Sequence, residues 1–488
     1  MSKHNHHRRR DTVIAIIGGL LVAVQFFASI LLIFSLLKLN ILQVWQFALV
    51  VGILVLIFAY NVFELFFRQR ARLFGKIASC VLAALISAGC FYAYSYIQQA
   101  NDFLAEITTV HEETIVYEVR VHKDSGITDF KQLAGQPIGS LKNSPNLEHT
   151  KNTLKDQLGD YVDAEYEEIG LMIADLYEHK IPAVVINESY LSFLEDTDYD
   201  LEADTTKVYE FRVRNTEKVD LRKPVDVVQE PFIIYISGSD APSGRINDTS
   251  RSDVNILAVV NPAKGKILLV NIPRDYYVQL HGTTGIPDKL THAGLYGINM
   301  SKATIEDLLG IQINYTFKIG FSGVKKFVDA IDGIDIESRA KMNIRNEKGK
   351  MCYIKEGWNH LDGECALRYA RERHTFKYGD LDRGKNQQQV ITAVINKLTD
   401  LHYLTRYTQI LDAAKGTFQT SLSDTEITNF VRWQLAELKH WQVESIQIEG
   451  QNSMQPTYSL GSTKLYVFLR NEASETAAKE KITEYLTK

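Results

Sequence analysis

The chain has 488 residues and a formal net charge of −5, with ordinary numbers of glycine (29) and proline (10). A slightly acidic chain without a basic tail does not favour general nucleic-acid binding, which depends on an excess of Lys and Arg. The length is enough for more than one domain with its own core.

Three long apolar runs occupy the first hundred residues, at 13–37, 41–67 and 77–97. A helix rises about 1.5 Å per residue, so the first run would span roughly 37 Å, enough to cross a bilayer. It is also longer than the apolar stretch of a cleavable signal peptide. We therefore predict three N-terminal transmembrane helices in a lipid bilayer, within a membrane segment that covers residues 1–98.

Two groups of basic residues flank these runs on the same side of the predicted membrane. Four precede the first run and four separate the second from the third: Lys3, Arg8, Arg9 and Arg10, then Arg68, Arg70, Arg72 and Lys76. Positive charge beside a span stays in the cytoplasm. This pattern predicts a multi-pass cell-membrane protein with a cytoplasmic N-terminus and an extracellular C-terminal part.

Polar residues inside the runs allow a second interpretation, a transport path through the membrane. They are Gln43, Gln46, Asn61 and Glu64. Glu64 lies one helical turn before Arg68, which favours a position near the cytoplasmic interface instead.

Residues 99–229 are predicted to form a small α/β accessory domain. Strand-like segments occur at 114–121, 136–140 and 183–186, and a helix is expected at 147–158. Fifteen acidic residues and a single lysine fall between Asp156 and Asp204. A solvated acidic face explains them better than calcium binding, because no loop has the required Asp-x-Asp-x-Asp-Gly form.

Residues 230–488 alternate strand-like and helical segments, which predicts a three-layer α/β/α domain with a mixed sheet. Strands are expected at 232–237, 254–260 and 266–272, and helices at 302–309, 323–331 and 387–398. Two further helices (401–417 and 424–437) and a last strand (464–469) follow.

Charged residues gather where these strands begin or end. Asp240 follows the first strand, Arg251 and Asp253 precede the second, and Arg274 and Asp275 follow the third. If the second strand is antiparallel to its neighbours, one crevice collects all of them. Arginines with carboxylates suit a polyphosphate and its divalent metal, although each group taken alone could be a surface ion pair. Motifs for a phosphate-binding loop, an esterase elbow or a zinc protease are absent from the sequence.

Cys352 and Cys365 are the two cysteines beyond the spans, thirteen positions apart in a compartment that permits disulfides. A bridge is favoured over two free thiols, and it would contribute about 3 kcal/mol on the chain-entropy model.

Several stretches together resemble the LytR–CpsA–Psr family of bacterial cell-envelope proteins, in its capsule- or exopolysaccharide-linked branch. They cover residues 232–398 and include Gly238-Ser239-Asp240, Arg251-Ser252-Asp253, Ile272-Pro273-Arg274-Asp275, Lys289-Leu290-Thr291-His292-Ala293, the run from Leu361 to Arg373, and Asp382-Arg383 through Gln387. The segment before them and the three spans also fit this branch.

The resemblance implies a glycopolymer–peptidoglycan phosphotransferase. Such an enzyme moves a glycan phosphate from a polyprenyl pyrophosphate carrier to peptidoglycan, with capsule assembly proteins as further expected partners. Asp240 and Asp253 would hold Mg²⁺ or Mn²⁺, and the pyrophosphate would be bound by Arg251, Arg274, Lys289, Arg371, Arg373, Arg383 and Gln387. Arg274, Asp275 and Arg371 are the expected catalytic residues, with Asp275 as base or as orienter of Arg274. Many members have Arg-Gln where this chain has Asn386-Gln387, and Lys385 could replace the lost contact.

Two alternative functions stay open at this stage. One is a hydrolase that cleaves the polyprenyl pyrophosphate without a glycan acceptor. The other is a non-catalytic lipid-binding regulator of capsule assembly, which would have no turnover for an Asp253→Ala substitution to abolish.

Overall fold

The computed structural model describes residues 2–68, 73–108, 113–191, 199–214, 222–239, 241, 244–345, 349–399, 410 and 415–487, without the side chains of 2–12, 15 and 73. Two compact units are present. One combines Met1–Glu106 with Ser423–Leu438, and the other combines Ile107–Leu422 with Lys439–Lys488. Each is described by itself.

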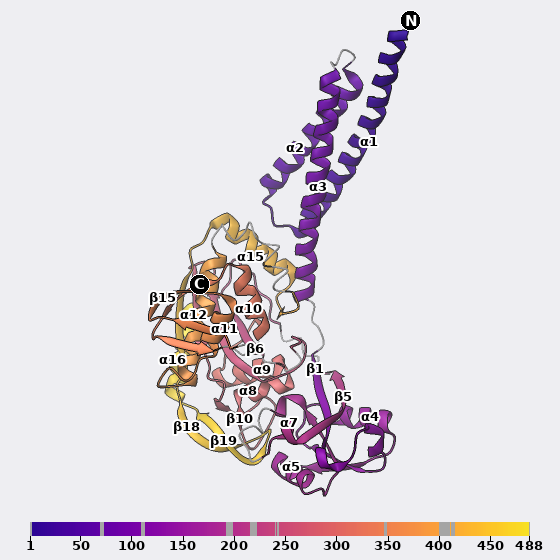
Figure 1. The fold of residues 1–488 in the computed structure, drawn as a ribbon. Helices are drawn as coiled ribbons and strands as arrows, with labels where there is room; N and C mark the ends of the chain where they lie inside the picture. Colours follow the sequence, from indigo (N-terminus) through magenta and orange to yellow (C-terminus); the bar gives the residue numbers. More distant parts are fainter. Residues whose placement is uncertain are drawn as a thin grey trace. The chain divides into compact units, whose positions relative to one another are not determined.

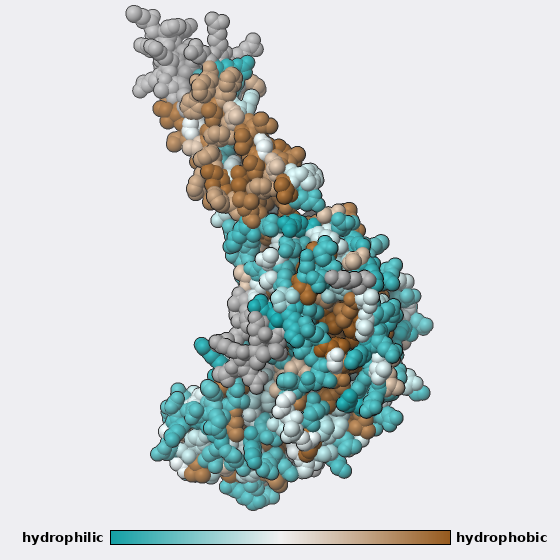
Figure 2. Space-filling view, turned by 180° about the vertical axis from the view of Figure 1, so that it is seen from behind, coloured by the Kyte–Doolittle hydropathy of each residue, from teal (hydrophilic) through white to brown (hydrophobic). Residues whose placement is uncertain are grey.

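The first unit contains three helices long and apolar enough to cross a membrane, as the sequence predicts. They are α1 (Ser2–Leu39), α2 (Val44–Val62) with its π-helical extension η1 (Phe63–Phe67), and α3 (Leu73–Thr108). Hydrophobic residues cover them in Figure 2. Helix α3 continues past the expected end at residue 97, so the boundary at residue 98 falls inside it. The amphipathic helix α15 (Asp424–Glu437) has the predicted bounds.

Polar side chains inside the bundle bond to one another. Asn61 Nδ2 donates to Gln25 Oε1 (2.9 Å), and Ser79 Oγ donates to Asn61 Oδ1 (2.8 Å). This chain links all three helices, the usual role of polar groups buried between spans. Glu64 pairs with Arg68 at 2.9 Å. Asn61 thus joins the helices, and Glu64 pairs within its own helical segment, so these contacts give no support to a transport path.

A five-stranded sheet of order β3-β2-β4-β1-β5 forms the small α/β part of the second unit. Its strands are β1 (Thr114–His122), β2 (Pro137–Leu141), β3 (Val162–Tyr166), β4 (Ala183–Asn187) and β5 (Thr205–Arg214). Helix α4 (Leu147–Leu158) packs on one face, and α5 (Ile169–Tyr177) packs on the other. Short 3₁₀ turns η2 (Lys123–Ser125), η3 (Phe130–Leu133) and η4 (Glu188–Tyr190) and helix α7 (Leu201–Asp204) connect them. The three predicted strands and α4 are confirmed, whereas β3, β5 and α5 were not predicted.

The larger sheet has six strands in the order β16-β11-β6-β7-β8-β17. They are β16 (Phe418–Thr420), β11 (Tyr315–Gly320), β6 (Phe232–Ser239), β7 (Ser252–Asn261), β8 (Lys266–Asn271) and β17 (Gln442–Gln447). Strands β7 and β16 run antiparallel to their neighbours, and the other pairings are parallel. The predicted mixed sheet is confirmed.

Helices cover both faces of this sheet, which gives the predicted three layers (Figure 1). One face packs on α8 (Leu290–Ala293), α9 (Ile298–Leu309) and α16 (Glu472–Leu486). On the other face lie α10 (Phe321–Ala330), α11 (Gly363–Arg371) and α12 (Asp380–Leu398). The short strands β9 (Tyr277–Val278) and β10 (Asp288–Lys289) and the turn η5 (Gly294–Tyr296) surround α8.

Two antiparallel ribbons lie outside the central sheet. Strand β19 (Gly461–Leu469) pairs with β18 (Gln451–Thr457), so the predicted last strand does not join the main sheet. Strands β12 (Ile334–Ser338) and β13 (Met342–Arg345) pair with β15 (Gly357–Leu361) and β14 (Met351–Ile354). Most of the helix expected at 401–417 lies outside the described residues.

Candidate functional site

The ends of three neighbouring strands meet at one edge of the larger sheet. Strand β7 runs antiparallel to both β6 and β8, with Ser252 opposite Ser239. The start of β7 therefore lies beside the ends of β6 and β8, which brings Asp253 close to Arg274. This arrangement is the one on which the predicted single crevice depends. Asp240, which directly follows β6, lies outside the described residues.

A layer of buried hydroxyl groups and one close backbone approach, at Gly294, hold the start of β7 in place. Ser237 Oγ lies 2.7 Å from Ser252 Oγ, and Tyr235 OH donates to Asn255 Oδ1 at 2.6 Å. At Gly294 an added Cβ would lie 2.4 Å from the carbonyl oxygen of Ser250. Only glycine lets the segment after α8 approach this backbone so closely.

Asp253 and Arg274 form a buried ion pair. Arg274 Nη1 donates to Asp253 Oδ1 at 2.8 Å, and Thr291 Oγ1 approaches the same oxygen at 3.4 Å. Burial by itself would raise the pKa of Asp253, but the guanidinium groups of Arg274, Arg383 and Arg251 hold that pKa well below its ordinary value. Asp253 is therefore a carboxylate at any physiological pH.

Asp275 is also ionised, and it connects Arg274 with Lys289. Its Oδ2 lies 3.5 Å from Arg274 Nε, and its Oδ1 lies 3.0 Å from Lys289 Nζ. Burial opposes ionisation, yet these two cations lower the pKa of Asp275. A carboxylate with a lowered pKa is a poor proton acceptor. The geometry thus favours Asp275 as the residue that orients Arg274 over Asp275 as the base.

Helix α12 adds a second buried pair, Arg383 with Asp380. Arg383 Nη2 lies 2.6 Å from Asp380 Oδ1 and 3.5 Å from the backbone oxygen of Asp253. Burial raises the pKa of Asp380, and the negative charge of Asp275 raises it further against the opposing effect of Arg383. Sequence reasoning gave Asp380 no role. The available signal was its spacing of three residues from Arg383, which places both side chains on one helix face.

The tight contact of α12 with the sheet depends on Gly384. A Cβ at this position would lie 2.2 Å from Asn271 Nδ2 and 2.8 Å from Gln447 Oε1. Asn271 is the last residue of β8, so the missing side chain lets Arg383 reach the strand ends.

Two of the buried guanidinium groups have unsatisfied donors. Within the part of the chain that the structure describes, Arg274 Nε and Arg383 Nε are buried and have no hydrogen-bond acceptor. A buried donor without a hydrogen-bond acceptor lowers the folding stability by about 1–3 kcal/mol, and by more when the group is charged. Donors of this kind in a buried cationic cluster are what a multivalent anion would satisfy.

The other predicted residues occupy the borders of this cluster. Gln387 is buried on α12, one turn beyond Arg383. Arg373 is exposed, and its charge contributes to lowering the pKa of Arg383, after burial as the main cause. The Arg371 guanidinium lies 4.6 Å from the centre of the Phe321 ring, just beyond the end of β11. Arg251 directly precedes β7.

Lys385 and Asn386 do not contact this cluster in the way that phosphate ligands would. Lys385 Nζ lies 3.7 Å from Asp382 Oδ1. Asn386 is fully buried, where its Nδ2 donates to the backbone oxygen of Tyr369 and its Oδ1 accepts from Arg339. Asn386 thus has a structural role in joining α12 to α11.

A divalent cation fits one part of the site. Asp253 offers an ionised hard oxygen ligand, and Mg²⁺ is commonly held by one or two carboxylates together with substrate phosphates. Among the described residues no group of three or more His, Cys, Asp or Glu could hold a metal. A cation here would therefore depend on Asp253, on Asp240 and on the phosphates of the substrate.

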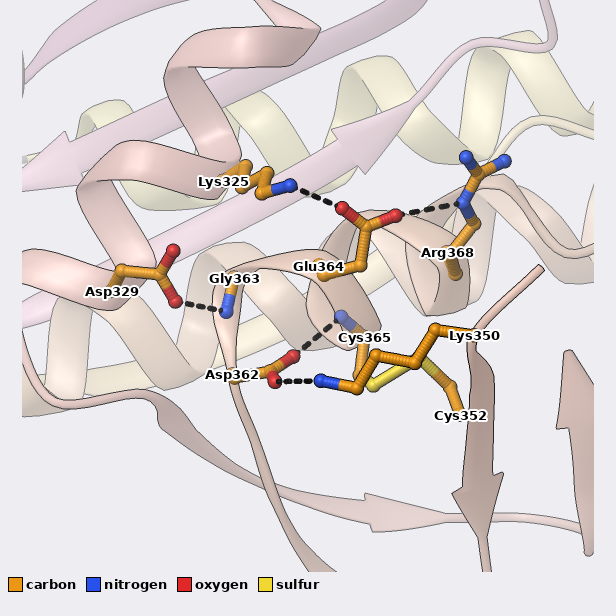
Figure 3. Close-up of a disulfide and its surroundings, with 9 residues drawn as sticks. All are labelled: Lys325, Asp329, Lys350, Cys352, Asp362, Gly363, Glu364, Cys365 and Arg368. Carbon is orange, nitrogen blue, oxygen red and sulfur yellow. Dashed lines mark hydrogen bonds and ion pairs between the residues drawn. A yellow bond between two sulfur atoms is a disulfide. The ribbon is translucent and has the colours of Figure 1, made fainter. Parts of the chain in front are cut away.

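A disulfide joins Cys352 of β14 to Cys365 of α11 (Figure 3). The Asp362 side chain caps the same helix by accepting a hydrogen bond from the backbone N–H of Cys365 at 2.8 Å. The N–H of Gly363 donates to Asp329 Oδ1 at 2.7 Å. Because α11 ends at Arg371, these contacts anchor the helix that carries a candidate site residue.

The model of the LytR_cpsA_psr family matches residues 199–481. The chain belongs to the LytR_cpsA_psr family. The match includes every candidate site residue from Asp240 to Gln387 and both cysteines of the disulfide. It begins after the three spans.

Relatives of this family have named activities. A Bacillus cereus protein named polyisoprenyl-teichoic acid–peptidoglycan teichoic acid transferase TagU is 34% identical over 215 residues, which are 44% of this chain and 66% of that protein. An Enterococcus faecalis protein of the same name is 33% identical over 203 residues, 40% of this chain and 63% of that protein. The chain thus spans just under two thirds of the length of these relatives. The crystal structure of B. subtilis TagV is 26% identical, with a TM-score of 0.44 over 53% of this chain and 98% of that chain.

Proposed function

We propose that this protein is a phosphotransferase that moves a glycan phosphate from a polyprenyl pyrophosphate carrier to peptidoglycan. The observation that carries the proposal is the buried cluster of Arg274, Arg383 and Lys289 around Asp253, Asp275 and Asp380, with two unsatisfied guanidinium donors. The activity named for the TagU relatives supports it. We further propose that the glycan is capsular or exopolysaccharide, since the accessory domain and three spans resemble that branch of the family.

In this reaction an acceptor hydroxyl oxygen attacks the phosphorus next to the sugar. A new phosphorus–oxygen bond forms to the acceptor, the bridging bond of the pyrophosphate breaks, and polyprenyl phosphate leaves with the electron pair. Arg274 and Arg383 would grip the oxygens on which negative charge develops, with Lys289, Arg371, Arg373 and Gln387 at the border of the same site. Mg²⁺ or Mn²⁺ held by Asp253 and Asp240 would neutralise part of this charge.

We infer that Asp380, in place of Asp275, takes the proton of the acceptor hydroxyl. The pKa of Asp380 is raised, whereas the pKa of Asp275 is lowered. A base works best when its pKa lies near the operating pH. Asp275 would then keep Arg274 and Lys289 in position.

The proposed location follows the charges beside the spans. Lys3, Arg8, Arg9 and Arg10 lie at the start of α1, ahead of its apolar run, and favour a cytoplasmic N-terminus. Three spans would then put the α/β domains outside the cell. Peptidoglycan and the exported lipid-linked glycan are both available there.

The test is transfer by the full chain in detergent, with a polyprenyl pyrophosphate-linked glycan labelled in the sugar and purified peptidoglycan as acceptor. Label should become covalently bound to peptidoglycan, and Asp253→Ala should abolish this transfer. Release of sugar phosphate into solution at the same rate with and without peptidoglycan would instead identify a hydrolase. Tight lipid binding without turnover would identify a regulator.

A further inference from the structure

A long hairpin beside the site exposes aromatic side chains. Its strands β12 and β13 pair with β15 and β14, and its inner face packs Ile334, Ile336, Met342, Ile354 and Leu361 into a core cluster. The outer face includes the exposed residues Asp335, Glu337, Asn343, Arg345, Tyr353, Trp358 and His360 and the half-buried Met351. We call this outer face the aromatic strip.

Two large aromatic residues in the strip are unusually exposed. Trp358 is 63% exposed and Tyr353 is 75% exposed. Tryptophan is on average highly buried in folded proteins, and the solvent face of an antiparallel ribbon is normally polar. An exposed tryptophan on such a face therefore points to a ligand that covers it.

The neighbours of these rings identify the chemistry of that ligand. Glu337 lies opposite Trp358 across the ribbon, Asn343 lies opposite Tyr353, and Asp335 pairs with His360 at 2.8 Å. A sugar ring has an apolar C–H face that packs on an aromatic ring and a rim of hydroxyl groups that bond to carboxylate, amide and imidazole. The strip contains both acidic and basic groups, so it lacks the one-sign field that a polyanion requires.

The hairpin is attached to the elements of the candidate site at two points, one at its C-terminal end and one between β12 and β13. The disulfide fixes β14 to α11, and β15 continues through Asp362 into the helix that ends at Arg371 (Figure 3). After β12, Arg339 donates to Asp382 Oδ1 at 2.8 Å and to Asn386 Oδ1 at 3.0 Å, on the helix of Arg383. A polymer that lies along the strip would thus pass close to the arginine cluster.

We propose that the aromatic strip binds the glycan strands of the peptidoglycan acceptor, an inference that rests on the proposed function. In the proposed reaction the lipid-linked donor would be held by its pyrophosphate. The acceptor glycan has no phosphate to anchor it, so positioning its hydroxyl requires a separate surface for neutral sugar rings. An open strip on a fixed hairpin suits such a long polymer.

The test is co-sedimentation of the full chain in detergent with purified peptidoglycan sacculi that have been stripped of attached glycopolymers. Trp358→Ala should weaken sedimentation by about tenfold or more, the scale of losing an aromatic anchor, and Trp358→Phe should restore most of it. Leu171→Ala is the matched control, because it removes a 58% exposed apolar side chain from α5 and should leave sedimentation unchanged.

The affinity for the lipid-linked donor, measured on the same variants, should not change. The proposal is overturned if Trp358→Ala sediments as wild type does, or if it loses donor affinity to the same extent, because the strip would then hold the donor glycan. If the sedimentation of the wild type depends on Trp358 but the protein transfers no glycan, the proposed function is refuted and the binding of peptidoglycan by the aromatic strip is not.

Discussion

Replacing Arg274 by glutamine is expected to expose how strongly the site depends on its buried ion pair. Arg274 and Asp253 lie 2.8 Å apart with side chains only 15% and 10% exposed. Removing one partner of such a pair leaves an uncompensated buried charge and costs about 3–5 kcal/mol. Arg383 and Arg251 also face Asp253, so we expect the lower end, about 3 kcal/mol, or a fall in Tm of roughly 6–12 °C for a domain of this size.

The loss of folding stability in Arg274→Gln should depend on pH, because it depends on the ionisation of Asp253. Its folded-state pKa is depressed, so its ionised form contributes stability above the ordinary carboxyl value of about 3.9, and this stability is lost as the pH falls through the depressed value. In Arg274→Gln that contribution is largely removed. The difference in folding stability between Arg274→Gln and wild type is therefore largest at pH 7, and it decreases once the pH falls below about 4.

Thermal unfolding of the full chain in detergent, followed by intrinsic fluorescence, measures this effect. The double variant Arg274→Gln/Asp253→Asn is the control, because neutralising the stranded carboxylate should recover part of the lost stability. If Arg274→Gln unfolds within about 2 °C of wild type, or if the double variant is no more stable than Arg274→Gln, the buried ion pair does not have the role assigned to it.

Three further changes test other parts of the structure. Cys352→Ala/Cys365→Ala opens a 13-residue loop, so the unfolding free energy should fall by about 3 kcal/mol; an unchanged denaturation midpoint would mean that the bridge does not form. Gly384→Ala drives a Cβ against Asn271, so transfer should fall at least about tenfold while helix content by circular dichroism stays constant; wild-type turnover would show that α12 can shift freely. Asp380→Asn removes a carboxylate whose raised pKa makes its ionised form destabilising as pH rises above about 4. This variant should therefore gain stability over wild type between pH 4 and pH 7 and lose turnover, and a loss of stability at pH 7 would contradict the assignment.

The elements that reasoning from sequence recovers are those with strong local signals. Strands β6, β7 and β8 are short apolar runs bounded by charged residues, and α4 and α15 have clear periodicity and end signals. The hairpin β12–β15 was not predicted, because its strands are short, four or five residues each, and the sequence between β13 and β14 has no two-residue turn motif. The last strand was predicted but its partner β18 was not, since pairing partners depend on tertiary packing that a single strand does not encode.

In the candidate site, too, the residues with a local sequence signal were predicted and those that depend on tertiary packing were not. Arg274 and Asp253 lie next to predicted strands, so their meeting depends only on the direction of β7. Asp380 could not be assigned from its position alone, because its raised pKa arises from burial and from the charge of Asp275, more than a hundred residues earlier in the chain. The role of Asn386 likewise depends on Arg339, between β12 and β13, and on Tyr369 of α11.

Binding of a short-chain polyprenyl pyrophosphate to the full chain tests most directly whether the arginine cluster recognises a diphosphate. The matched variant is Arg373→Gln, an exposed position where folding should be unaffected. We expect wild type to bind the pyrophosphate far more tightly than the corresponding polyprenyl alcohol, and Arg373→Gln to lose about tenfold or more of the pyrophosphate affinity, as expected for a lost charge-assisted hydrogen bond. Equal affinity of wild type for the pyrophosphate and the alcohol would contradict a diphosphate site.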